Sequence, residues 1–291
     1  MPEYEDRYWM SADGLKLHYR DYPGRADRPP LLCMPGLTRN ARDYADLAER
    51  LAGDWRVIAV DFRGRGMSEN AKDAMSYVPV TYADDIAALI TDLGIERWIA
   101  VGTSLGGIVT MLLAARGVGT LAGVILNDIG PEIEPAGLSR IRGYVGRQQV
   151  WPTWMHAARA IAEANADVYP RWRIEEWLAM AKRLYRLNSA GRIVLAYDMK
   201  IAEPLRVPGN EAAPDMWAAL AAMKHVPMLI VRGALSDVLA AKTAERMVAA
   251  IDHAELVTVA DTGHTPTLVE PEALAAIDRL FADVDAQAAR V

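Results

Sequence analysis

Several features that mark other classes of protein are missing from this chain of 291 residues. Its one cysteine, Cys33, cannot form a disulfide within the chain and lies in an apolar run typical of a buried strand. The formal net charge of −6 at pH 7 argues against a general nucleic-acid or anionic-membrane surface. No apolar run approaches the length of a membrane span, and the first residues lack the basic and apolar regions of a signal peptide. We therefore expect a soluble, cytoplasmic protein that binds neither nucleic acid nor membrane.

Sequence signals for a cofactor or a metal ion are also absent. Gly117-Val118-Gly119 follows a predicted helix, whereas a dinucleotide-binding glycine loop follows a strand. No pair among the five histidines has the spacing of zinc ligands. We expect chemistry that depends on the chain's own side chains, with no cofactor and no metal.

The chain shows a regular alternation of strand and helix patterns. Apolar runs bounded by turn residues predict strands over 7–10, 15–21, 31–34, 56–60, 98–101, 121–126, 227–232 and 255–260. Helical patterns cover 41–51, 81–93, 215–225, 240–251 and 271–281, and Thr81 with Asp84 forms a capping-box pattern. Strands separated by helices of this length predict an α/β fold with a parallel sheet covered on both faces. Asp13-Gly14 between the first two strands predicts an antiparallel hairpin.

The alternation stops between Glu132 and Val207. This part shows no convincing strand, and helical stretches are predicted over 138–148, 153–164 and 173–186. We interpret 132–207 as a helical cap inserted into a core domain of 1–131 and 208–291. The cap is rich in tryptophan, and Trp151 and Trp154 are candidates for lining a substrate pocket. The alternative is that these rings only pack the cap onto the core.

Residues 98–109 carry the strongest chemical signal. An apolar run leads into Gly102-Thr103-Ser104-Leu105-Gly106, and a second apolar run follows. A strand can turn this sharply into a helix only where the flanking positions tolerate crowding, as Gly102 and Gly106 do. The pattern predicts Ser104 at the tip of a strained turn, with the N–H of Leu105 at a helix N-terminus where negative charge is favoured. Ser104 is therefore a candidate nucleophile, and Leu105 a candidate oxyanion donor.

Two further side chains follow predicted strands. Asp237 comes after the strand over 227–232, and His264 comes after the strand over 255–260. A serine hydroxyl needs a nearby base whose tautomer is fixed by a carboxylate. Since the carboxyl ends of parallel strands share one edge of the sheet, Ser104, Asp237 and His264 are predicted to converge there as a catalytic triad.

These motifs together resemble those of the α/β-hydrolase superfamily, in particular its capped, esterase-like members. They are Pro35-Gly36-Leu37, Asp61-x-Arg63-Gly64-x-Gly66-x-Ser68, Gly102 to Gly106, Arg232-Gly233 to Asp237, and Gly263-His264-x-Pro266. The resemblance covers nearly the whole chain and implies the α/β-hydrolase fold, with a mostly parallel eight-stranded sheet and an inserted cap. It also implies the N–H of Leu37 as the second oxyanion donor, with Pro35 standing where the family often has histidine.

Some residues keep alternative interpretations. Asp128 follows the strand over 121–126, where some families of this fold place the acid, so it is the alternative to Asp237. Asp61 and Arg63 are expected to shape a loop. Glu132 and Glu134 are expected to be solvated, the alternative being contact with substrate under the cap.

We expect a serine hydrolase that cleaves a carboxylic ester through an acyl-enzyme on Ser104. Its partner would be a small-molecule ester or a related acyl compound, and a homo-oligomer is compatible with the sequence. A serine at this turn argues against the dehalogenase and epoxide-hydrolase branches of the family, which place an aspartate there. The alternatives are a carbon–carbon bond hydrolase or lactonase with the same triad, and a non-catalytic ligand receptor with this fold.

Overall fold

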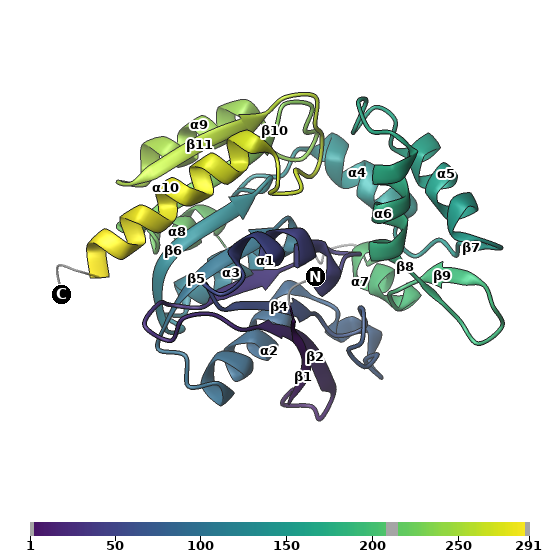
Figure 1. The fold of residues 1–291 in the computed structure, drawn as a ribbon, viewed down its shortest axis with the longest axis horizontal. Helices are drawn as coiled ribbons and strands as arrows, with labels where there is room; N and C mark the ends of the chain where they lie inside the picture. The colour runs from purple at the N-terminus through teal and green to yellow at the C-terminus, as the bar shows by residue number, and fades with distance from the viewer. Residues whose placement is uncertain (1–2, 208–214, 289–291) are drawn as a thin grey trace.

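An eight-stranded sheet forms the centre of the computed structural model, which describes residues 3–207 and 215–288 (Figure 1). Its order is β1-β2-β4-β3-β5-β6-β10-β11. The strands are β1 (Glu5–Met10), β2 (Lys16–Tyr22), β3 (Leu31–Met34), β4 (Val57–Asp61), β5 (Arg97–Thr103), β6 (Thr120–Asn127), β10 (Met228–Gly233) and β11 (Ala254–Val259). Each predicted strand is present, and the predicted fold class is confirmed.

The directions of the strands decide where the functional loops meet. The strands β1 and β2 form an antiparallel hairpin around Asp13-Gly14, and β2 pairs antiparallel with β4. From β4 to β11 all neighbours are parallel. The carboxyl ends of β3, β5, β6, β10 and β11 therefore share one edge of the sheet, which is where open α/β sheets bind ligands.

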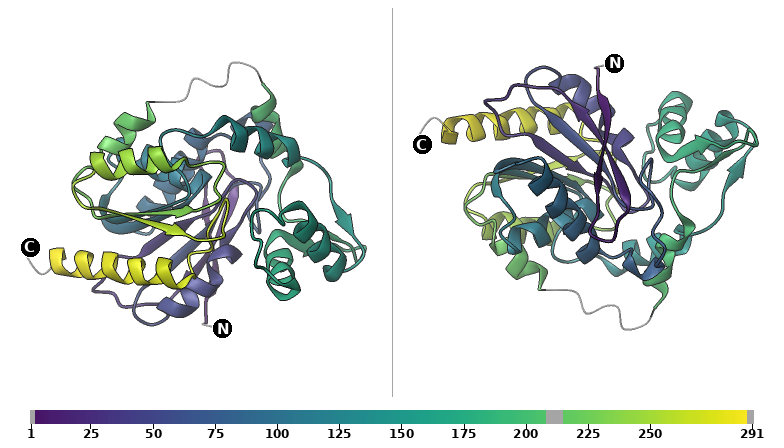
Figure 2. Two further views of the ribbon diagram at one scale, coloured as in Figure 1. Left: turned by 90° about the horizontal axis from the view of Figure 1, so that it is seen from above. Right: turned by 90° about the horizontal axis from the view of Figure 1, so that it is seen from below.

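Helices cover both faces of this sheet (Figure 2). One face is covered by α1 (Ala45–Leu51) and α10 (Pro271–Ala288), and the other by α2 (Pro79–Asp92), α3 (Leu105–Ala115), α8 (Met216–Ala221) and α9 (Ala241–Ala250). Alternate residues of β5 enter the two resulting cores, with Trp98 and Ala100 on the α3 side and Ile99 and Val101 on the α10 side. The central strands are apolar on both faces because both faces are buried.

Residues 135–206, between β6 and β10, form a separate group that we call the inserted segment. It contains α4 (Pro135–Tyr144), α5 (Trp154–Ala164), α6 (Ile174–Leu184), the 3-10 helix η3 (Met199–Ala202) and α7 (Glu203–Arg206). Within it α5 and α6 enclose a small core of their own. Figure 1 shows the segment beside one end of the main sheet.

The expectation of no strand in this part of the chain is wrong. The segment includes β7 (Val150–Trp151), β8 (Tyr185–Leu187) and β9 (Ile193–Leu195), which form an antiparallel sheet. Strands of two or three residues are too short to show an alternating pattern. The division into a core of 1–131 and 208–291 and a cap of 132–207 stays a prediction, and residues 208–214 lie outside the described residues.

Two predicted helix starts also differ from the structure. The helix expected from Thr81 begins at Pro79, since proline suits the first turn, where no intrahelical acceptor is needed. The stretch from residue 41 opens with the 3-10 helix η1 (Ala41–Tyr44), capped by the side chain of Asn40, before α1 begins. A further 3-10 helix, η2, spans Ala74–Ser76. None of the helices in the described ranges combines the length and apolar character needed to cross a bilayer.

Candidate active site

The turn between β5 and α3 holds Ser104 in a strained conformation. Its φ of 51° is positive, a region that side-chain-bearing residues rarely adopt. Small neighbours make the turn possible: a Cβ on Gly106 would lie 1.9 Å from the carbonyl oxygen of Met34. Ser104 is the N-cap of α3, and its side chain lines a cavity. The predicted strand, turn and helix around the serine are therefore present.

Ser104 and His264 are in hydrogen-bond contact, as predicted. The Oγ of Ser104 lies 2.9 Å from Nε2 of His264, and Nδ1 of that ring lies 2.7 Å from Oδ2 of Asp128. A carboxylate only accepts hydrogen bonds, so Nδ1 carries the proton of the neutral ring and Nε2 is left as acceptor for the serine hydroxyl. The arrangement can take a proton from Ser104.

Asp128 is held by several donors at the end of β6. Its side chain is fully buried. Besides His264, it accepts hydrogen bonds from the backbone N–H of Gly233 at 3.0 Å and from Oγ of Ser236 at 2.6 Å. A buried carboxylate with this many donors is fixed in position.

The prediction that Asp237 orients His264 is wrong. The carboxylate of Asp237 instead binds the guanidinium of Arg140 on α4, with Nε and Nη2 donating at 2.6 and 2.8 Å. Ser236, one residue earlier, turns toward Asp128 and accepts hydrogen bonds from the N–H groups of Val238 and Leu239, which directs this loop away from His264. The hydrogen bonds and charge of Arg140 hold the pKa of Asp237 below its usual range. The alternative acid, Asp128, occupies the place beside the imidazole.

Of the two predicted oxyanion donors, Leu105 follows Ser104 directly in the chain, and Leu37 lines the same cavity as Ser104. Leu105 begins α3, so its N–H has no acceptor within the helix. Leu37 lines the cavity together with Ser104. The loop around Leu37 is fixed on both sides, because the carbonyl of Gly36 accepts from the N–H of Arg39 and that of Leu37 accepts from Nε of the buried Arg65. Because Gly36 and Leu37 share a trans peptide, the N–H of Leu37 points away from the Gly36 carbonyl.

A cavity of about 360 Å³ opens above the serine. The main domain supplies Ser104, His264 and the loop of residues 36–39, and the inserted segment supplies side chains from α4, α5, α6 and the small sheet. The residues of the inserted segment that line it include Arg140, Tyr144, Gln149, Ile161, Tyr169, Trp177, Met180 and Tyr197. A volume of this size suits a small organic substrate, and the wall offers both apolar surface and polar groups that can orient it.

The prediction of Trp151 and Trp154 as pocket residues is wrong. Both rings pack against the separate core of the inserted segment and are not among the residues lining the cavity. Trp177, on α6, lines it instead. The amphipathic helices of the segment carry aromatic rings on more than one side, and only their packing decides which ring faces the serine.

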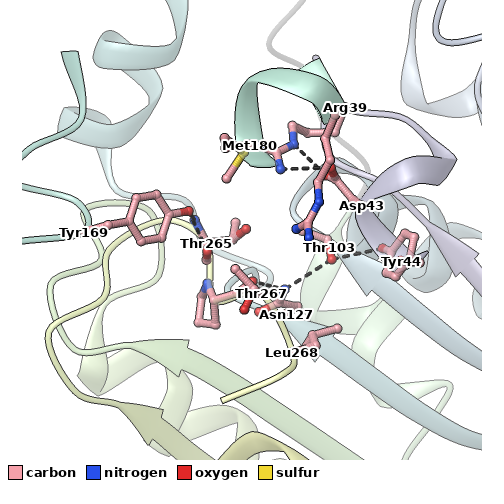
Figure 3. A pocket seen from close by; sticks show the side chains of 12 residues that line it. Arg39, Asp43, Tyr44, Thr103, Asn127, Tyr169, Met180, Thr265, Thr267 and Leu268 are labelled. Carbon is pink, nitrogen blue, oxygen red and sulfur yellow. Dashed lines mark hydrogen bonds and ion pairs between the residues drawn. The ribbon is translucent and has the colours of Figure 1, made fainter. Parts of the chain in front are cut away.

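A second, much smaller recess adjoins this cavity (Figure 3). Its volume is about 20 Å³, enough for one water molecule. Asn127 donates through Nδ2 to Oγ1 of Thr103 and to the carbonyl of Pro266. The ion pair of Arg39 and Asp43 forms another wall. Sequence reasoning did not identify either feature.

Two contacts join the inserted segment to the loop that carries His264. The hydroxyl of Tyr169 donates to the carbonyl of Thr265 at 2.7 Å, and the N–H of Gly263 donates to the carbonyl of Val168. Burial raises the pKa of Tyr169 to about 12, so its hydroxyl remains a donor at neutral pH. The segment therefore fixes the backbone on both sides of the imidazole.

Asp61 and Arg63 shape loops, as predicted. Asp61 accepts hydrogen bonds from the backbone of Ala41 and Met67 and contacts Nδ1 of the buried His18. Arg63 is buried between Asp85 and Asp13.

Glu132 is bound outside the cavity by Arg246 and by the indole N–H of Trp217, and Glu134 is likewise absent from the cavity wall. Neither glutamate contacts a substrate held beside Ser104 in this arrangement. Within residues 3–207 and 215–288, no group of three or more metal-ligating side chains gathers.

Comparisons with known proteins show what this chain is similar to. A family model described as the alpha/beta hydrolase family matches residues 31–277. The 3-hydroxybutyrate-oligomer hydrolase of Cupriavidus necator is 34% identical over 282 residues, covering 94% of this chain and 95% of that protein. The 2-(acetamidomethylene)succinate hydrolase of Mesorhizobium japonicum is 28% identical over 246 residues, covering 84% of each. The crystal structure of an alpha/beta hydrolase from Novosphingobium aromaticivorans has a TM-score of 0.93 at 56% identity, covering 97% of this chain and 99% of that one.

Proposed function

Because the chain belongs to the alpha/beta hydrolase family and the relatives described above are hydrolases, we propose that it is a serine hydrolase that cleaves a carboxylic ester through an acyl-enzyme on Ser104. The observation that carries the proposal is the unbroken hydrogen-bond chain from Ser104 through His264 to Asp128. The receptor alternative requires only the pocket, whereas catalysis requires a hydroxyl, a base and a buried acid in this order, so the arrangement favours catalysis.

The reaction follows from the positions of these groups. Oγ of Ser104 forms a bond to the ester carbonyl carbon while its proton passes to Nε2 of His264, and Asp128 stabilises the imidazolium. The N–H groups of Leu37 and Leu105 bind the oxyanion. The carbon–oxygen bond to the alcohol breaks, and His264 gives its proton to the departing oxygen. Water, deprotonated by His264, then attacks the acyl carbon and releases the acid and Ser104.

Short oligoesters of hydroxy acids are the substrate class we favour. Support comes from the 3-hydroxybutyrate-oligomer hydrolase, whose similarity extends over nearly the full length of both chains. The size of the cavity suits a compact ester, and its wall is mixed, with tyrosines and arginines among apolar side chains. The same triad could also cleave a lactone or a carbon–carbon bond. Measuring kcat/KM for a linear dimer ester, a lactone and a ring-fission acid would show which of these is the best substrate.

Replacement of Ser104 by alanine tests the proposal. S104A should lower kcat for a p-nitrophenyl ester by roughly 10⁶-fold, because the nucleophile is gone while the cavity remains. A fluorophosphonate probe should label the wild type and not the variant. The control is S189A, which removes an exposed hydroxyl in the turn between β8 and β9. Wild-type protein that neither turns over any ester nor reacts with the probe would favour the receptor alternative.

A further inference from the structure

Two arginines line the cavity above Ser104, and each is oriented by its own aspartate. Arg39 donates through Nε and Nη2 to Asp43, and Arg140 donates through Nε and Nη2 to Asp237. In both pairs the aspartate accepts hydrogen bonds from the edge of the planar guanidinium that carries Nε and Nη2. Within the described residues, the opposite edge, formed by Nη1 and the second N–H of Nη2, makes no hydrogen bond in either arginine. A guanidinium fork of this kind matches the two oxygens of a carboxylate.

The topology of the sheet puts these arginines on opposite sides of the nucleophile. Ser104 follows β5, Arg39 follows β3 on one side of it, and Asp237, which holds Arg140, follows β10 beyond β6 on the other side. Arg39 belongs to the oxyanion loop: its Cγ would lie 3.3 Å from a Cβ on Gly36, and Cβ of Ser104 would lie 3.6 Å from the same point. Arg140 lies on the side of the acid, because Ser236, beside Asp237, donates to Asp128.

The reaction proposed above assigns the two halves of the ester to these sides. The departing alcohol oxygen must receive its proton from Nε2 of His264, so the alcohol half lies toward His264 and Asp128. In a linear oligoester of a 3-hydroxy acid, the last alcohol half is itself a hydroxy acid with a free carboxylate. That carboxylate is separated from the departing oxygen by two carbon atoms, so it too must lie on this side of the cavity.

We propose that Arg140, held in place by Asp237, binds a carboxylate on the alcohol half of the ester, so that the enzyme removes hydroxy-acid units from the free-carboxylate end. This inference rests on the proposed function and deepens it. The aspartate fixes one edge of the guanidinium and leaves the other for the substrate. The pair carries no net charge by itself, so recognition depends on two directional, charge-assisted hydrogen bonds, and neutral esters are not repelled. The helix α4 brings Arg140 to the site, so the inserted segment sets the specificity.

The hydrogen-bonded environment keeps the pair ionised under assay conditions. Arg140 holds the pKa of Asp237 below its usual range, so the carboxylate is charged at neutral pH and continues to orient the guanidinium. The side chains of both residues are 34% exposed, so a ligand can reach them. The sequence predicts Asp237 as the acid of the triad, and its contact with Arg140 gives this residue a different role.

The test compares two substrates that differ only in the proposed contact: the linear dimer of 3-hydroxybutyrate and its methyl ester. The quantity measured is the ratio of KM for the methyl ester to KM for the free acid. In R140Q this ratio should fall by about ten- to a hundredfold, because the charged hydrogen bonds are lost for the acid alone. The inhibition constant of 3-hydroxybutyrate against p-nitrophenyl ester hydrolysis should rise to a similar degree.

Two further variants make the result specific. R116Q breaks an ion pair between Arg116 and the more exposed Asp84, remote from the cavity, in which the arginine is as exposed as Arg140, and should leave the ratio unchanged. R39Q removes the arginine on the oxyanion side. A ratio that falls in R39Q and not in R140Q would overturn the proposal and put the carboxylate on the acyl side. Should R140Q fail to fold, R140K, which keeps the charge but not the fork, replaces it and should give a smaller fall in the same ratio.

Failure of this inference and failure of the proposed function give different results. If R140Q weakens both substrates equally, Arg140 only packs α4 against the loop after β10, and the inference is overturned while ester hydrolysis stands. If the wild type hydrolyses no ester and does not react with a fluorophosphonate, the proposed function fails first.

Discussion

The loops that follow β6 and β10 each place an aspartate at the same edge of the sheet, but the two carboxylates differ in burial and in hydrogen-bond partners. Asp128, after β6, is fully buried and contacts His264, Ser236 and the backbone of Gly233. Asp237, after β10, is one-third exposed, and its carboxylate accepts two hydrogen bonds from Arg140 of the inserted segment. Position at the edge is therefore not enough to bring an acid to the imidazole. The donors that surround the carboxylate decide whether it binds His264 or an arginine of the inserted segment.

Replacing each of the two aspartates by asparagine should give the largest difference in kcat between paired variants. D128N should lower kcat for p-nitrophenyl butyrate by about 10³- to 10⁴-fold, because the amide no longer holds His264 in the tautomer that accepts the serine proton. D237N should change this rate severalfold at most, since its side chain does not contact the imidazole. Steady-state kinetics at saturating ester, with circular dichroism to verify folding, measures both. A loss in D237N as large as that in D128N would restore Asp237 as the acid.

Removal of the hydroxyl of Ser236 should give an intermediate effect. Oγ of Ser236 donates to Asp128 and accepts from Val238 and Leu239, so it joins the two loops under comparison. S236A should lower kcat roughly tenfold, because the carboxylate loses one of its charge-assisted hydrogen bonds. The control is T91A, which removes an exposed hydroxyl that donates to the carbonyl of Ala87 within α2. An unchanged kcat in S236A would mean that His264 and Gly233 suffice to fix Asp128.

The fold was predictable because its signals are local. Each strand is an apolar run with turn residues at its ends, and the hairpin at Asp13-Gly14 needs only two residues to specify it. Ser104 was predictable for the same reason, since glycines that permit its turn stand beside it in the sequence. His264 followed because it alone among the histidines comes directly after a predicted strand.

The acid and the pocket were not predictable, since both depend on contacts between distant parts of the chain. Asp128 and Asp237 each follow a strand, and only the turn at Ser236 and the approach of α4 separate their uses. A Cβ on Gly137 of α4 would lie 2.3 Å from the carbonyl oxygen of Asp237, which shows how closely these elements approach. Likewise, a string of residues does not tell which side of α6 faces the serine, so Trp177 was not distinguished from Trp151.

The smallest expected effect concerns stability and its dependence on pH. Arg140 lowers the pKa of Asp237 in the folded protein, so the ion pair contributes stability above the unfolded-state pKa, near the ordinary value of 3.8, and loses it as the pH falls through the folded value. Because both side chains are 34% exposed, solvent screens the pair, and its coupling free energy should be about 0.2–1 kcal/mol.

A double-mutant cycle of R140Q and D237N, measured by urea unfolding near neutral pH and again at a series of acidic pH values, isolates this coupling from other effects of each substitution. The coupling should be present at neutral pH and should decline as the pH falls through the lowered pKa of Asp237. A coupling that persists in acid would mean that Arg140 and Asp237 stabilise each other by packing rather than by charge. In that case the charge of Asp237 would not orient the guanidinium of Arg140 toward a substrate carboxylate. The two loops would then differ only in how deeply their aspartates are buried.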